Sequence, residues 1–180
     1  SRDEGRTWSE PRIIAPAAAF GTKNVMSVSA VEQLDGRLAF YFLIKENDFT
    51  TTLGRAISPD GESFTVERCE ARSPAAYYVV NNDRIIRLSD GTLVAPASYI
   101  SAEDNRTGSH HSMIATALIS KDDGKSFTKA DFDFGTADPV NARYGHQEPG
   151  MFERADGSVY LWTRTNYGCQ YESLSEKGLD

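Results

Sequence analysis

The chain contains 180 residues, a length typical of one domain with a sizeable hydrophobic core. Its 26 acidic and 19 basic side chains give a formal net charge of −7, whereas a nucleic-acid-binding protein needs a basic face. No apolar run reaches the ~18 residues of a membrane-spanning helix. The totals therefore predict neither nucleic acid nor membrane as a partner. An anionic small substrate is compatible with them, provided that a few arginines overcome the acidic field locally.

One short motif recurs along the chain. Residues 1–8 and 120–127 both contain a serine, an aspartate two positions later, a glycine, a hydroxyl residue and then an aromatic ring. Residues 58–64 are a version shortened by one position, and residues 175–180 resemble a fourth copy without its aromatic residue. The copies are roughly 60 residues apart, and a period of this kind is typical of repeat architectures.

The residue types of this motif predict a tight turn closed by a hydrophobic plug. Its aspartate accepts hydrogen bonds from backbone N–H groups of the same turn, and its glycine adopts a positive φ without steric cost. The final aromatic ring folds under the turn and is buried. A calcium loop needs further oxygen ligands and a closing glutamate, which are absent. A phosphate-binding loop needs a glycine where Ile119 stands, so the motif predicts structure rather than a ligand site.

A second repeat, an Asp-Gly pair between two apolar segments, lies between the copies of the motif. Such a pair is a strong signal for a β-hairpin. The pairs are Asp35-Gly36, Asp90-Gly91 and Asp156-Gly157. The predicted strands cover residues 28–34, 38–45 and 51–57, then 84–88, 92–100 and 112–119, then 150–154, 159–163 and 170–174. With one more strand after each motif, every unit is predicted to be a four-stranded antiparallel blade.

The predicted fold class is all-β: a β-propeller with about three blades in units near residues 9–64, 65–127 and 128–180. Residues 38–44 are apolar on both faces, as expected for a strand whose sheet is covered on both sides. Closed propellers have roughly 4–8 blades, so the chain is expected to be part of a longer protein. Exposed blade edges would then allow self-association.

The recurring motif resembles the Asp-box of the sialidase-type β-propellers, which are also known as BNR-repeat proteins. In that superfamily the box joins the third and fourth strands of a blade, on the side away from the active site. The resemblance covers essentially the whole chain and implies a six-bladed propeller in the complete protein. It also favours a secreted or periplasmic location. The box occurs in many propellers, so it fixes no activity.

Polar residues at the starts of the three innermost predicted strands are the first candidates for a site. These starts, residues 23–27, 80–84 and 145–150, precede their Asp-Gly turns at similar offsets. Because inner strands converge on the propeller axis, we expect the three starts to lie near one another. The alternative is that asparagine and aspartate only form turns before a strand. The candidate pocket-lining residues are Asn24, Asn82, Asp83 and Gln147.

Glu148 and Arg164 are the strongest candidates for functional residues. The Asp-Gly turn lies midway between them, which predicts that their side chains meet at one end of the hairpin. Apolar neighbours predict that the pair is buried; a buried ion pair needs a reason, whereas a surface pair contributes little. The segment resembles the part of exo-α-sialidases that carries the catalytic glutamate and the second arginine of the arginine triad.

This resemblance implies a role for each residue. In exo-α-sialidases the glutamate activates a tyrosine nucleophile, three arginines bind the substrate carboxylate, and an aspartate is the acid/base. Glu148 then corresponds to the activating base and Arg164 to a carboxylate ligand, for which the planar guanidinium is well suited. The first arginine and the aspartate would precede Ser1, and the third arginine and the tyrosine would follow Asp180. The chain alone is therefore expected to be inactive.

The favoured function is a sialidase-like glycoside hydrolase that removes terminal sialic acid or a related acidic sugar, with no metal or organic cofactor. Residues 81–83 resemble a stretch of sialidase-like propellers of uncertain substrate, and Asp83 is hypothesised to be the acid/base of such a variant. One alternative is a non-catalytic carbohydrate-binding propeller, because fold does not fix function. Another is a polysaccharide lyase acting on uronic acids, with His146 beside Arg143 and Tyr144.

The two cysteines, Cys69 and Cys169, lie far apart in the sequence and have no metal-type spacing. Both are predicted to be buried as small hydrophobic side chains. A disulfide between them is the alternative that the sequence leaves open.

Overall fold

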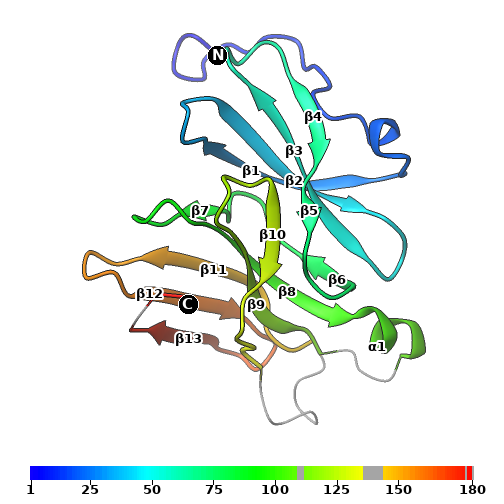
Figure 1. The fold of residues 1–180 in the computed structure, drawn as a ribbon, viewed down its shortest axis with the longest axis vertical. Coiled ribbons are helices and arrows are strands. Elements are labelled where there is room, and N and C mark those ends of the chain that lie inside the picture. The colour runs from blue at the N-terminus through cyan, green and yellow to red at the C-terminus, as the bar shows by residue number, and fades with distance from the viewer. Residues whose placement is uncertain (109–111, 136–143, 177, 180) are drawn as a thin grey trace.

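The computed structural model describes residues 1–108, 112–135, 144–176 and 178–179. Three β-sheets follow one another along the chain, from the N-terminal sheet at the top of Figure 1 to the C-terminal sheet at the bottom. Sequential strands pair antiparallel in each sheet, and an Asp-Gly turn joins the innermost strand to the next. The predicted all-β fold is confirmed, and the three sheets are blades of a partial β-propeller.

The first sheet has four strands in the order β1-β2-β3-β4. The Asp35-Gly36 turn joins β1 to β2, and the motif at residues 58–64 joins β3 to β4. A short 3-10 helix, η1 (Ala17–Phe20), precedes the sheet. The strands are β1 (Val25–Glu32), β2 (Leu38–Lys45), β3 (Thr51–Ser58) and β4 (Thr65–Arg68).

The second sheet has the order β5-β10-β9-β8-β6, and β7 also pairs with β8. Its inner strand is therefore divided into β6 and β7 by residues 80–85. The motif at residues 120–127 follows β9 and leads into β10. The strands are β5 (Glu70–Ala71), β6 (Ala76–Val79), β7 (Ile86–Arg87), β8 (Leu93–Ser101), β9 (Ile114–Ser120) and β10 (Ser126–Lys129).

The third sheet has the order β11-β12-β13, and the Asp156-Gly157 turn joins its first two strands. The alternation of β12 is regular: Val159, Leu161 and Thr163 are buried, while Tyr160, Trp162 and Arg164 lie on the opposite, more exposed face. The strands are β11 (Gln147–Glu153), β12 (Val159–Arg164) and β13 (Gln170–Ser175).

One short helix, α1 (Ala102–Thr107), follows β8 and was not predicted. The Ser101 hydroxyl accepts a hydrogen bond from the Asp104 N–H at 3.0 Å, and Gly108 ends the helix with a φ of 67°. Such caps stabilise short helices, but six residues are too few to show a helical period in a sequence. Among the described residues, no helix is long and apolar enough to cross a membrane.

Apolar side chains fill the space between successive sheets. Tyr41 and Leu43 of the first sheet pack with Leu93 and Phe127 of the second in one cluster, and Met151 of the third sheet packs with the second sheet in another. A further cluster on the other face of the first sheet includes side chains of the N-terminal segment. Strand β2 is therefore covered on both faces, as its continuous apolar sequence predicts.

The recurring motif makes the predicted turn hydrogen bonds in its three copies at residues 1–8, 58–64 and 120–127. Asp122 accepts a hydrogen bond from the backbone N–H of Ser126 at 2.9 Å and from its hydroxyl at 2.6 Å. The glycines of the three copies have φ values of 84°, 74° and 80°. Equivalent backbone hydrogen bonds are accepted by Asp3 and Asp60. Each turn is thus held by its own side chains.

The aromatic plug is present in two of these copies and absent in the first. Phe127 is 3% exposed in the core between the first two sheets, and Phe64 packs against Phe40. Trp8, in contrast, is 78% exposed, so the prediction that its ring is buried is wrong. Residues 1–16 pair with no sheet in the described structure, and the indole reaches only the carbonyl of Gly5, at 3.0 Å. In the fourth copy, positions 177 and 180 lie outside the described residues.

Candidate functional site

Each innermost strand carries one non-glycine residue in the left-handed region, at the level where the sequence predicted polar strand starts. The φ values are 56° at Ser27, 52° at Asp83 and 50° at Glu148. Ser27 and Glu148 lie in β-bulges of β1 and β11, and Asp83 lies in the break between β6 and β7. Positive φ is uncommon for such residues, and bulges redirect side chains near functional sites. The three strand starts therefore share one backbone feature, which the sequence did not reveal.

Glu148 and Arg164 meet at the end of the β11–β12 hairpin. Nη2 of Arg164 lies 3.0 Å from Oε1 of Glu148 and donates a hydrogen bond to Oε1 of Gln147 at 2.6 Å. The side chains of the pair are 47% and 43% exposed, so the prediction that it is buried is wrong. The reason is the alternation of β12, which places Arg164 on the face away from the second sheet. A half-exposed pair leaves both groups open to a ligand.

The other predicted site residues make different contacts. Oδ1 of Asn82 accepts a hydrogen bond from the N–H of Val28 at 2.8 Å, and the Asp83 N–H donates to the Val28 carbonyl at 2.8 Å. These bonds tie the inner strands of the first two sheets together. Asn24 contacts the sulfur of Met26 at 3.6 Å. Within the described part of the chain, the side-chain contacts thus bring Gln147, Glu148 and Arg164 together, but not Asn24, Asn82 or Asp83.

His146 lies directly before the Gln147–Glu148 bulge and is only 1% exposed. Its Nδ1 is 2.7 Å from the hydroxyl of Thr163, and its ring packs between Phe134 and Tyr171. Burial lowers the pKa of His146, which favours the neutral ring. A substrate has no access to such an imidazole, which argues against the lyase alternative. Arg143, which that alternative also used, lies outside the described residues.

Arg84 and Trp162 were missed by the sequence reasoning. The guanidinium carbon of Arg84, in the second sheet, lies 5.6 Å from the centroid of the Trp162 ring in the third. No sequence signal connects the two positions, because the contact depends on how successive blades pack. Trp162 lies two positions before Arg164 on the same face of β12, so the contact borders the Glu148–Arg164 pair.

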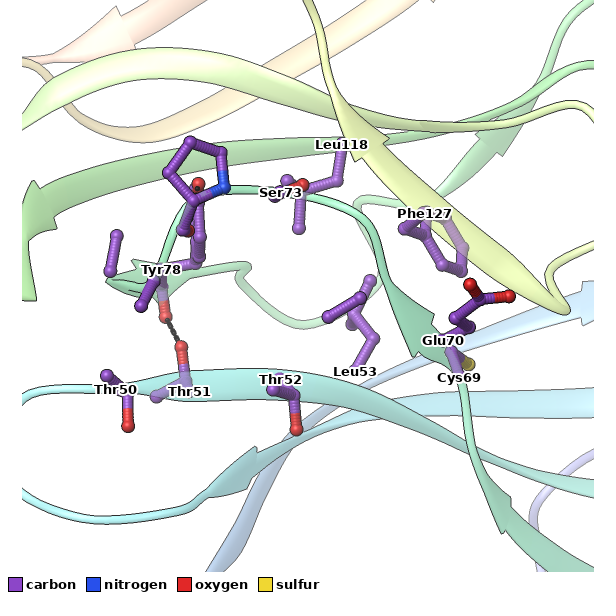
Figure 2. A pocket seen from close by; sticks show the side chains of 14 residues that line it. Thr50, Thr51, Thr52, Leu53, Cys69, Glu70, Ser73, Tyr78, Leu118 and Phe127 are labelled. Atoms are coloured by element: carbon purple, nitrogen blue, oxygen red, sulfur yellow. Dashed lines mark hydrogen bonds between the residues drawn. The ribbon is translucent and has the colours of Figure 1, made fainter.

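A cavity of about 240 Å³ lies between the first two sheets (Figure 2), and its lining does not include this pair. The Thr51 hydroxyl crosses it to donate a hydrogen bond to the Tyr78 carbonyl at 2.6 Å. Burial raises the pKa of the lining Cys69 thiol to about 12, so this side chain is inert rather than nucleophilic. Its burial was predicted, whereas Cys169 is exposed and both thiols are free. In the described ranges no cluster of three or more His, Cys, Asp or Glu side chains is arranged to hold a metal ion.

These features define a segment of a β-propeller built from Asp-Gly hairpins and recurring Ser-Asp-Gly turns, with polar residues on its innermost strands. The BNR repeat-like domain matches residues 1–180. The chain therefore belongs to the BNR repeat-like domain family, as the sequence resemblance predicted. Among curated proteins none matches the chain.

Solved structures share the fold. The Hadza microbial sialidase Hz136 has a TM-score of 0.70 at 19% identity, over 98% of this chain and 37% of its own. For Trypanosoma rangeli sialidase in complex with sialic acid the TM-score is 0.61 at 16% identity, over 98% and 30%. For the endo-arabinase from Bacteroides thetaiotaomicron it is 0.53 at 13% identity, over 91% and 58%. The chain thus spans only part of the length of each of these proteins.

Proposed function

We propose that the chain is part of a sialidase-like glycoside hydrolase that removes terminal sialic acid or a related acidic sugar from glycans. The observation that carries the proposal is the half-exposed Glu148–Arg164 pair, at 3.0 Å, at the end of the hairpin that resembles the sialidase segment. The fold that the chain shares with two sialidases supports the same function. Because an endo-arabinase shares the fold as well, the fold does not select an acidic substrate, and that part of the proposal rests on Arg164.

Arg164 binds the substrate carboxylate in this proposal. A guanidinium has five N–H donors in a planar fork that matches a carboxylate. The contacts to Gln147 and Glu148 both use Nη2, so in the described structure the remaining nitrogens have no protein acceptor. Those donors are available to a ligand, and the two protein contacts hold the fork in place.

Glu148 activates a tyrosine nucleophile from another part of the complete protein. Only its Oε1 contacts Arg164, which leaves Oε2 as an acceptor for a phenolic proton. A carboxylate beside the phenol lowers the cost of removing that proton, and tyrosine is the known exception to carboxylate nucleophiles in glycosidases. The positive φ of Glu148 turns its side chain out of the regular strand alternation.

Asn24, Asn82, Asp83 and Gln147 line the pocket in this proposal, and Asp83 is the acid/base of a variant site. The support is positional, because Asp83 occupies in the second sheet the backbone position that Glu148 occupies in the third. Asn82 uses its amide oxygen to hold Val28, which leaves its NH₂ group for a sugar hydroxyl. The reaction uses protein side chains only.

The proposal is tested with the complete reading frame that contains this chain, and with the chain alone. The complete protein is expected to release 4-methylumbelliferone from its sialoside faster than from the matching glucoside, and the chain alone to release none. Release by the chain alone would contradict the roles assigned to residues outside it. Binding of sialic acid without turnover would support a carbohydrate-binding propeller instead. A rise in absorbance from an unsaturated uronate product would support a lyase.

A further inference from the structure

The Arg84–Trp162 contact joins all three sheets beside the candidate site. The backbone N–H of Arg84 donates a hydrogen bond to the buried hydroxyl of Ser29 in the first sheet, at 3.0 Å. Its guanidinium extends to Trp162 in the third sheet. The indole is fixed in turn, since a Cβ at Gly150 would lie 2.1 Å from it and only glycine fits there. Arg84 is thus held at both its backbone and its side-chain end.

The surroundings of the Arg84 guanidinium differ from those of three other arginines in the described ranges. Arg55, Arg87 and Arg164 each form an ion pair with a carboxylate. Among the described residues, Arg84 is paired with no carboxylate, and its guanidinium has no hydrogen-bond acceptor. Arg84 is partly buried, and a guanidinium that stacks on an aromatic ring contacts it through its face. The N–H donors along its edge therefore remain available. Such a group is ready to bind an anion.

The ring that holds the Arg84 guanidinium lies on the same strand as Arg164. Trp162 and Arg164 are two positions apart on the same face of β12, which separates them by about 7 Å along the strand. The cation on Trp162 therefore borders the same surface as the Glu148–Arg164 pair. Two guanidinium groups on one surface offer charged N–H donors to a carboxylate, on a chain whose net charge is −7.

We propose that Arg84 is a further substrate-binding residue, a guanidinium held on Trp162 that binds the carboxylate of an acidic sugar together with Arg164. The inference rests on the proposed function and narrows its substrate to carboxylated sugars. It differs from a purely structural contact, in which Arg84 would only tie the second sheet to the third. The two cases are separable, because only a binding role makes the effect of Arg84 depend on the charge of the ligand.

The experiment compares sialic acid with its uncharged methyl ester in the complete protein. Calorimetric titration gives the affinity for each ligand in wild type, R84Q and R84K. R84Q is expected to weaken binding of the acid about tenfold, because a charge-assisted hydrogen bond is lost, and to leave binding of the ester unchanged. R84K retains the charge without the planar fork and is expected to lie between the two.

Arg12 provides a control for the ring contact, because its guanidinium carbon lies 5.4 Å from the centroid of the Phe64 ring, although it also pairs with Glu62 at 3.1 Å. R12Q is expected to bind both ligands as wild type does. Equal effects of R84Q on acid and ester, or none on either, would overturn the inference. If R84Q does not fold, R84K decides in the same way: equal affinity of wild type and R84K for the acid overturns the inference. The inference is also overturned if wild type binds the acid no more tightly than the ester.

The proposed function and this inference can be refuted independently of each other. Acid-selective binding that depends on Arg84, without hydrolysis of any acidic glycoside, would support the inference and refute the hydrolase. Hydrolysis of a sialoside with the same KM in wild type and R84Q would support the hydrolase and refute the inference.

Discussion

The backbone conformation of Glu148 has a free-energy cost that an ordinary strand residue does not have. A non-glycine residue at positive φ is strained by roughly 1–3 kcal/mol, and such strain persists where the surroundings fix it. The φ of 50° at Glu148 is repeated at Ser27 and Asp83, so the distortion belongs to the blade and not to one residue. At two of the three positions the redirected side chain is a carboxylate. The repeat architecture therefore supplies the geometry, and the residue type supplies the chemistry.

Substitutions of Glu148 and Arg164 separate catalysis from binding in the complete protein. E148Q keeps the side-chain shape but removes the base, so kcat is expected to fall about 100-fold or more. R164K keeps the charge but loses the planar fork, so KM for carboxylated substrates is expected to rise. Thermal unfolding should change little, because a half-exposed pair contributes at most about 1 kcal/mol. Steady-state kinetics on a fluorogenic sialoside measures both variants, and wild-type parameters in both would refute the roles assigned to Glu148 and Arg164.

A second prediction concerns Gly124, where the motif of the second sheet meets Tyr41 of the first. A Cβ at this position would lie 1.9 Å from the Tyr41 hydroxyl, and the φ of Gly124 is 80°. G124A is therefore expected to lose roughly 1–2 kcal/mol to backbone strain and a further 1–3 kcal/mol to overpacking. G157A is the matched control, because its φ is 83° and no atom lies within 4 Å. Urea denaturation measures both variants, and equal losses would contradict the close contact.

The sequence reaches the candidate site only in part. The meeting of Glu148 and Arg164 could be predicted, because an Asp-Gly turn midway between two residues fixes which strand ends are opposite. Their exposure could not, since it depends on which face of β12 packs on the second sheet. Arg84 was out of reach for the same reason: its ring partner lies in another blade. Pairing between adjacent strands follows from residues close together in the sequence, whereas packing between blades depends on residues far apart in it.

At the scale of elements, the motif turns are the parts whose chemistry the sequence predicts best. Backbone hydrogen bonds from Ser63 and Glu62 lower the pKa of Asp60 to about 2. Partial burial acts to raise the pKa of Asp122, but hydrogen bonds donated by Ser126 outweigh it and lower this pKa to about 2 as well. Both carboxylates accept these bonds in their charged form. The turns therefore depend on ionised aspartates.

Acid is expected to weaken the fold through these turns. The folded-state pKa of Asp122 lies below its ordinary value of 3.8, so its charge stabilises the fold above about pH 4, and this stabilisation is lost as the pH falls toward 2. D122N retains the side-chain shape without the charge. The free energy of unfolding of D122N should therefore change less than that of wild type between about pH 5 and pH 2.5. Urea denaturation across this range measures both proteins, and parallel curves would contradict the prediction.

The short-range sequence pattern predicts which segments form strands and turns. It does not predict which other segments pack against them. The predicted strands around the Asp-Gly turns correspond to β1, β2, β8, β11 and β12, although β1 and β11 each begin three residues earlier than predicted. Helix α1 was missed because a single capped turn has no period to detect. The exposure of Trp8 could not be foreseen either, since the plug needs a sheet beneath it and the motif itself does not reveal whether one is present.

For the molecule as a whole, a polar network holds the first two sheets together within their apolar interface. The carbonyl of Asp123, in the second sheet's motif, accepts a hydrogen bond from the buried Arg55 of the first sheet at 2.7 Å. Its carboxylate accepts hydrogen bonds from Arg87 at 2.6 Å and from the Leu34 N–H at 3.1 Å. Removing one member of such a network leaves a charge without its partner, which costs more than losing a surface pair. The second blade is therefore fixed to the first by its motif turn.

The third sheet leaves one face without such a cover in the described structure. Phe152 and Leu174 are 47% and 44% exposed, and Phe152 packs with Tyr160 and Trp162 on the same face. A contiguous apolar patch of this kind favours association, and β13 at the sheet edge adds unpaired backbone groups. The chain expressed alone is therefore expected to self-associate through this surface.

A charged substitution on this face tests the prediction. L174K places a cation among the exposed rings and beside the strand edge, so it is expected to shift the chain toward the monomer in sedimentation velocity at matched concentration. I13K is the control, because Ile13 is 83% exposed in the N-terminal segment, far from this face in sequence and outside any sheet. The control should associate as wild type does. Monomer at all concentrations in wild type, or equal dissociation in both variants, would show that the third sheet does not drive association.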